Sequence, residues 1–259
     1  MSKRNLFVLF AIAALALAVG CGKAEEPAPV TTAPPAAAPA AAVDPATAGS
    51  ITGKISFEGA KPKAKSIRMD QDAFCAKAHA TPIFFEDVVV NDNGTLRNVL
   101  VYVKGGLEGR TFPTPAEAAK LDQSACQYVP HVVSLMKDQK LDVVNSDSTN
   151  HNVNVLAEQN RPWNKSQAPN KSDVESFPRE EIVIPVKCNI HPWMKSYIGV
   201  FSHPFHAVTG ADGTFELKGL PPGDYEIEAW HEKYGTKTQK VTVAASEAKA
   251  ADFAFQPAP

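Results

Sequence analysis

The chain has 259 residues, of which 44% are hydrophobic and 21% are charged, a composition ordinary for globular proteins. This length accommodates one large domain or two modest ones. The formal net charge is −2, and it becomes −4 if Lys3 and Arg4 are removed with a leader. The chain lacks the positive excess that binds polyanions, so we expect no nucleic-acid partner.

The first 20 residues have the pattern of an export signal. Lys3 and Arg4 precede an apolar run at 6–19, which is too short for a membrane span of ~20 residues. The run ends at Gly20-Cys21, which resembles a bacterial lipoprotein signal. This resemblance implies cleavage before Cys21, lipidation of Cys21, and anchoring in the bacterial cell envelope, in the periplasm or at the outer membrane. The alternative is ordinary cleavage nearby.

Residues 21–48 are rich in alanine and proline and predict a disordered tether. Structure is expected to begin in the segment 49–110, where an alternating strand covers 50–58 and a second covers 65–69. Asp70 is expected to cap a short helix at 72–79. A β-hairpin is expected from two strands, with the turn at 91–94, and the strands cover 83–90 and 96–104.

Residues 111–206 predict a second group of strands with turns between them, the pattern of an antiparallel sandwich. The polar stretch 157–171 is expected to be a long loop. The expected strands cover 131–136, 140–145, 151–156, 182–187 and 196–201.

The segment 207–256 carries a threonine, an Asp-Gly turn, a Phe strand, Leu-Pro-Pro-Gly and a Tyr strand. It resembles the carboxypeptidase-regulatory-like domain, which has a transthyretin-like, or Ig-like, β-sandwich. The Gly-x-Ile strand near residue 51 and the Val-x-Val strand at 99–103 also resemble this family. We therefore expect residues 49–110 and 207–256 to form one sandwich with 111–206 inserted; three consecutive β modules are the alternative.

Three soft or borderline metal donors are evenly spaced in one short stretch: Cys188, His191 and Met194. A tight loop could direct all three at one point, and a thiolate, an imidazole and a thioether are the ligands that select copper. A second histidine is needed to complete a His2Cys set with an axial methionine. His151, at the start of an alternating strand, is the candidate.

These residues resemble the blue-copper cupredoxins of the amicyanin and plastocyanin type, over about residues 113–202. The resemblance implies one type 1 copper bound by His151, Cys188, His191 and Met194, with Asn152 tying the two ligand loops together. It also implies a Greek-key sandwich and a solvent-facing edge of His191 beside Pro192 and Trp193, through which a redox partner could dock. The expected fold class is all-β: a cupredoxin-like Greek-key sandwich plus a transthyretin-like sandwich.

The remaining cysteines outside the leader are Cys75 and Cys126, and thiols in exported proteins usually pair. We expect a disulfide between them, which leaves Cys188 as the single free thiol. The alternative is a Cys2His2 metal site that adds His79 and His131. The remaining histidines are His203, His206 and His231. A structural or interface role is expected for them, and a metal role of their own is the alternative.

The ligand set implies an electron carrier and not an enzyme, because four protein ligands leave no open position for a substrate. The expected partners are redox proteins, such as c-type cytochromes or an envelope dehydrogenase, and the membrane through the lipid on Cys21. The alternative is a cell-envelope module that binds a glycan or a protein, with copper structural or absent.

Overall fold

The computed structural model describes residues 43–257. The predicted signal and the lipidation candidate Cys21 lie outside the described residues. Of the predicted tether, only residues 43–48 are described; they contain a turn in which the carbonyl of Thr47 accepts a hydrogen bond of 3.0 Å from the amide of Ser246. Within the described range, no helix is long and apolar enough to cross a membrane.

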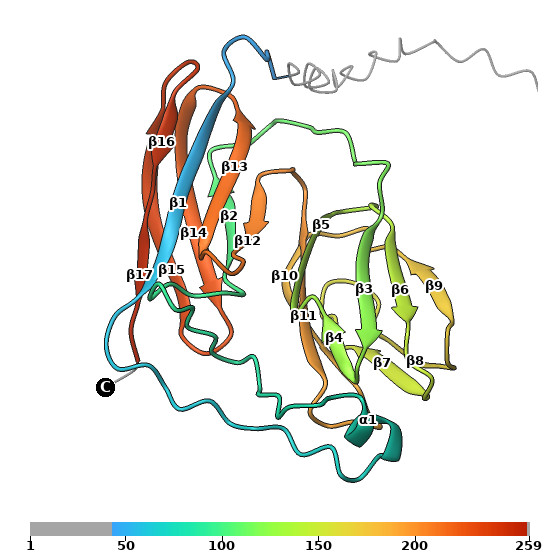
Figure 1. Ribbon diagram of the computed structural model, residues 1–259. Coiled ribbons are helices and arrows are strands. Elements are labelled where there is room, and N and C mark those ends of the chain that lie inside the picture. The colour runs from blue at the N-terminus through green and yellow to red at the C-terminus, as the bar shows by residue number, and fades with distance from the viewer. Residues whose placement is uncertain (1–42, 258–259) are drawn as a thin grey trace, which may run out of the picture. The chain divides into compact units, whose positions relative to one another are not determined.

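Apart from one short helix, α1 (Ala73–Lys77), the regular elements of residues 43–257 are β-strands (Figure 1). The predicted all-β class is therefore confirmed. The strands form four sheets, which pack as two sandwiches because each core cluster combines side chains from two of the sheets.

The first sandwich is built from both ends of the described chain. One sheet has the order β13-β1-β16, with β17 also paired to β1, and the other has the order β12-β2-β14-β15. Strands from before residue 111 thus pair with strands from after residue 205. The bounds are β1 (Gly49–Phe57), β2 (Leu100–Gly105), β12 (His206–Val208), β13 (Thr214–Leu220), β14 (Gly223–His231), β15 (Gly235–Val243), β16 (Ala248–Ala250) and β17 (Phe253–Phe255).

The second sandwich comes from the intervening residues. Its sheets have the orders β5-β11-β10-β7-β8 and β4-β3-β6-β9. Alternation explains its core: in β6 the odd positions Leu141, Val143 and Asn145 are buried. The bounds are β3 (Ala119–Ser124), β4 (Gln127–Val129), β5 (Val132–Met136), β6 (Leu141–Asn145), β7 (His151–Val155), β8 (Trp163–Gln167), β9 (Ser172–Glu175), β10 (Glu181–Lys187) and β11 (Lys195–Phe201).

The five strands expected within residues 131–201 are confirmed, but the predicted antiparallel sandwich also contains parallel pairs. β5 pairs with β11 in parallel, and β3 pairs with β6 in parallel. In the first sandwich, β16 and β17 both run parallel to β1. Such pairs join strands that are distant in sequence, which alternation alone does not reveal.

Several local predictions before residue 110 and in the polar stretch were wrong. Residues 65–69 form only a single bridge, from Ser66 to Phe84, and the expected hairpin is reduced to one bridge from Val90 to Leu96. The helix is capped by Asp72 and not by Asp70. The segment 157–171, which was expected to be a loop, contains the strand β8. This strand is polar in sequence and pairs with β7.

A small apolar cluster joins the two sandwiches. Leu100 and Tyr102 of β2 pack with Val132 of β5 and Phe201 of β11, while the alternate β2 residues Val101 and Val103 face the first core. β2 is therefore buried on both faces, consistent with its nearly continuous apolar sequence.

Candidate metal centre

The strand β7 and the loop between β10 and β11 position the predicted ligands. His151 is the first residue of β7, and Cys188 directly follows β10. The loop is closed by its own backbone: the Cys188 amide donates to the Met194 carbonyl at 3.2 Å, and the Met194 amide donates to the His191 carbonyl at 3.0 Å. This loop therefore returns Met194 to the level of Cys188.

Three of the four predicted ligands converge. Donor atoms of His151, Cys188 and His191 all lie within 4.8 Å of one another, and the three side chains are buried. The two Nδ1 atoms of the histidines face each other at 2.9 Å, and Sγ of Cys188 lies 3.9 Å from Nδ1 of His191. Met194 is buried in the same core cluster as Cys188.

The hydrogen bonds of the two imidazoles suit a bound cation. Nε2 of His151 lies 2.8 Å from Oδ2 of Asp147, and Nε2 of His191 lies 3.3 Å from Oδ2 of Asp72. Each carboxylate favours the proton on Nε2, which leaves both Nδ1 atoms with lone pairs directed at one another. Two imidazole nitrogens and the neighbouring Cys188 thiol are donors that copper prefers, so these three residues fit copper and would hold it.

Burial lowers the pKa of His151, and this effect outweighs the hydrogen bond to Asp147, which raises it. The imidazole is therefore neutral at pH 7 and can offer its lone pair to a metal. Asp147 is itself held by backbone donors: the amides of Ala125 and Cys126 donate to its two oxygens at 2.7 and 2.8 Å. Those two residues have positive φ angles, which direct both amides to one carboxylate.

Asn152 links the two ligand segments. Its Oδ1 accepts a hydrogen bond of 3.1 Å from the amide of Asn189, next to Cys188. Its own carbonyl accepts a hydrogen bond of 2.6 Å from the hydroxyl of Tyr128. The structure thus places Asn152 where it ties β7 to the loop after β10.

The structure joins Cys75 and Cys126 in a disulfide, and Cys188 is the free cysteine of the described residues. The alternative Cys2His2 site is not assembled. His79 Nε2 contacts the carbonyl of Ala125 at 2.7 Å, whereas His131 Nε2 contacts Glu232 at 2.5 Å.

The expectation that the ring edge of His191 faces solvent was wrong. His191 is only 2% exposed and Trp193 only 8%, while Pro192 is exposed. The indole N–H of Trp193 donates to the carbonyl of Cys126 at 3.0 Å, so the ring is turned inward. Asp72 and the disulfide cover the imidazole because the segment around α1 crosses to this site.

Asp147 and Asp72 were missed by sequence reasoning. Asp147 lies four residues before His151, and this short separation could have indicated that the two side chains are in contact. Asp72 is 119 residues from His191 and gave no signal.

The three remaining histidines lie outside the metal cluster. Burial lowers the pKa of His203, of His206 to about 3 and of His231 to about 4. His203 Nε2 contacts the Val103 carbonyl at 2.9 Å, and His206 stacks on Phe201 with ring centroids 4.6 Å apart. A structural or interface role for these histidines stays a prediction.

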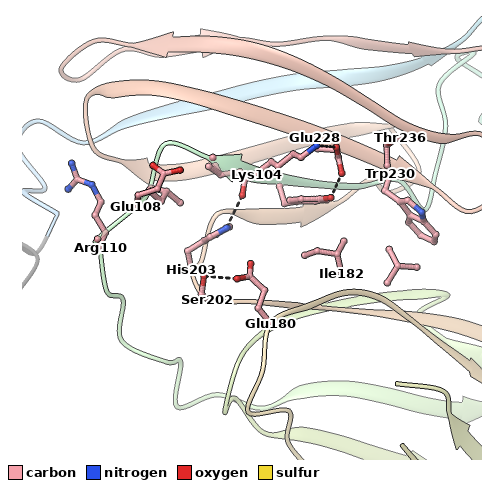
Figure 2. Close-up of a pocket in the computed structure, with 16 residues that line it drawn as sticks. Lys104, Glu108, Arg110, Glu180, Ile182, Ser202, His203, Glu228, Trp230 and Thr236 are labelled. Atoms are coloured by element: carbon pink, nitrogen blue, oxygen red, sulfur yellow. Dashed lines mark hydrogen bonds and ion pairs between the residues drawn. The ribbon is translucent and has the colours of Figure 1, made fainter. Parts of the chain in front are cut away.

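A cavity of about 710 Å³, shown in Figure 2, shares no lining residue with the metal cluster. In its lining, Lys104 Nζ lies 2.7 Å from Glu228, and the Tyr102 hydroxyl also donates to Glu228. Trp230 and Arg110 lie toward opposite ends of the cavity in this view. The size is that of a small-molecule pocket, and the lining mixes aromatic, apolar and ionic groups.

Comparison with known proteins gives one family match, in which residues 200–256 fit the carboxypeptidase regulatory-like domain. No curated protein sequence matches the chain.

The solved structures that it resembles include a copper-containing nitrite reductase from Thermus scotoductus, at 17% identity and a TM-score of 0.31 over 39% of this chain and 25% of that one. A purple cupredoxin from Nitrosopumilus maritimus matches at 19% identity and a TM-score of 0.28, over 32% of this chain and 98% of that one. An oxidised amicyanin mutant matches at 13% identity and a TM-score of 0.30, over 39% and 97%. Structural similarity at this level establishes no function for this chain. The family match is confined to residues 200–256, which resemble a carboxypeptidase regulatory-like domain.

Proposed function

We propose that the chain is an exported type 1 copper protein that carries one electron at a time between redox partners in the bacterial cell envelope. The observation that carries the proposal is the pair of Nδ1 atoms that face each other at 2.9 Å beside the buried Cys188 thiol. Two histidines and a cysteine, with Met194 from the same loop, are the donors of copper electron-transfer sites.

When bound, copper supplies a one-electron couple between Cu(II) and Cu(I). The residues of this chain supply a rigid, dry site: the backbone of the 188–194 loop is closed by its own hydrogen bonds, and the ligands are almost completely buried. Rigid ligands limit the rearrangement between oxidation states, which keeps electron transfer fast. If Met194 completes the set, four protein ligands would leave copper no open position for a substrate, so we propose a carrier and not an enzyme.

A redox partner, such as a c-type cytochrome or an envelope dehydrogenase, would contact the exposed tip of the ligand loop. Ile190 is 49% exposed and Pro192 is exposed, on either side of the buried His191. Lipidation of Cys21 would hold the protein at the membrane.

Voltammetry of the copper-loaded protein tests this proposal, with the metal-free protein as the control. We expect one reversible one-electron wave that the metal-free protein lacks. An irreversible wave, or no copper binding, would contradict the proposal.

A binding module is the second candidate, and the cavity of Figure 2 favours it. The proposed ligand is a cell-envelope glycan, whose apolar face would stack on Trp230 while its hydroxyls bond the ionic groups around Glu228. Titration with soluble peptidoglycan fragments, monitored by calorimetry, tests it. Saturable binding that is lost in Trp230→Ala but kept in Cys188→Ser would support it, and no binding to the wild-type protein would exclude it.

A further inference from the structure

The segment that carries α1 reaches the metal centre from the first sandwich. It belongs to the connection between β1 and β2, in which α1 lies beside the second sandwich (Figure 1). It places Asp72 and Cys75 against His191. Sγ of Cys75 lies 3.7 Å from Nε2 of His191. One sandwich therefore contributes the cover of a site whose predicted ligands all come from the other.

Asp72 uses its two carboxylate oxygens for different purposes. Oδ1 caps α1, because it accepts hydrogen bonds from the amides of Phe74 and Cys75 at 2.8 and 2.9 Å. Oδ2 is thereby turned to His191, at 3.3 Å from Nε2. The orientation of this oxygen is set by the helix cap and does not depend on a flexible side chain alone.

Two anchors hold this segment to a single turn of the second sandwich. Cys75 is bonded to Cys126, and His79 contacts the carbonyl of the neighbouring residue, Ala125. The amides of the same turn hold Asp147 against His151. The turn at 125–126 therefore supports both carboxylates, and each carboxylate faces one of the two histidine ligands.

We propose that residues 72–79 form a covalently anchored cap over the metal centre, in which Asp72 is a positioning residue for His191. Asp72 holds the imidazole proton on Nε2, so that Nδ1 is free to bind the metal, and the cap closes the imidazole to solvent. The inference rests on the proposed function for the identity of the metal, but the tautomer of His191 is a property of the metal-free chain.

Asp72→Asn is the diagnostic variant. Asparagine also caps helices, so α1 is expected to be retained. With its Oδ1 on the two backbone amides, its amide nitrogen would face His191 and donate to Nε2. The proton would then move to Nδ1, the atom needed for coordination. Asp70→Asn is the matched control, because Asp70 is nearby but pairs on the surface with Arg68.

Two-bond proton–nitrogen correlation spectra of the metal-free proteins report the tautomer directly. We expect Nε2–H at His191 in the wild type and in Asp70→Asn, and Nδ1–H in Asp72→Asn. Cu(II) competition with a chelator should show a loss of affinity of about 10- to 100-fold in Asp72→Asn alone.

An Nδ1–H tautomer in the metal-free wild type, or equal Cu(II) affinities for the two variants, would overturn the positioning role. Failure of the proposed function looks different: the wild type would not bind copper, although the spectra would still show the Asp72-dependent tautomer. Intact disulfides in both variants, checked by mass spectrometry without reductant, exclude loss of the cap as the cause of any difference.

Discussion

Removing the disulfide that anchors the cap should cost the metal-free protein a large part of its stability. The bond closes a loop with a sequence separation of 51 residues. For a loop of that size, the chain-entropy relation gives the unfolded state about 14 cal/mol/K of extra entropy when the bond is absent, or about 4 kcal/mol near room temperature. We therefore expect Cys75→Ala combined with Cys126→Ala to lower the free energy of unfolding by about 4 kcal/mol beyond the cost of deleting the two buried sulfurs.

Urea denaturation monitored by tryptophan fluorescence measures this change. Cys188→Ala is the matched control, since Cys188 is a buried cysteine outside any disulfide and reports the cost of deleting a buried sulfur. The double variant should lose several kcal/mol beyond twice the cost of the control. A difference below about 1 kcal/mol would refute the reasoning, because noncovalent contacts such as His79 to Ala125 would then suffice to hold the segment.

Two further variants test the packing of the first sandwich and its response to pH. In Gly53→Ala, the new Cβ would lie 2.2 Å from the carbonyl oxygen of Ala251, so chemical denaturation should show a loss of stability of about 2 kcal/mol or more. Gly210→Ala is the control, because the space around its new Cβ is open, and its stability should change by less than about 0.5 kcal/mol. Equal effects would contradict the close approach of β1 to residue 251. Burial lowers the pKa of His206 from 6.5 to about 3. Between these pH values the imidazole is protonated in the unfolded chain and neutral in the native chain, so stability falls as the pH drops from about 6.5 toward 3. His206→Phe keeps the stacking on Phe201 and should reduce that fall in denaturation curves collected across this range; an unchanged pH dependence would show that His206 does not contribute to it.

The fold was predictable where one face of a strand is buried. Ile51 and Ile55 in β1, or Leu141 and Val143 in β6, alternate with less buried neighbours, and these strands were found at nearly their true bounds. The polar strand β8 has only Gln167 fully buried, so it carries no such signal and was taken for a loop. Its residues form a strand because β7 offers a partner edge, which is a tertiary cause.

The candidate site shows the same division between local and distant causes. Cys188, His191 and Met194 could be found because one loop carries all three, and His151 because it begins an alternating strand. The cap could not be found, since Asp72 meets His191 only through a crossing between the sandwiches. The prediction that the ring of His191 faces solvent failed for that reason.

The central claim is that Cys188, with His151 and His191, binds copper, and the visible absorption spectrum tests it most directly. Residues 43–259, loaded with one Cu(II) per chain, should show an intense thiolate-to-copper charge-transfer band that bleaches on reduction with ascorbate. Cys188→Ser should bind copper without that band. A copper-loaded wild type with no intense band, or a band that persists in Cys188→Ser, would contradict the account.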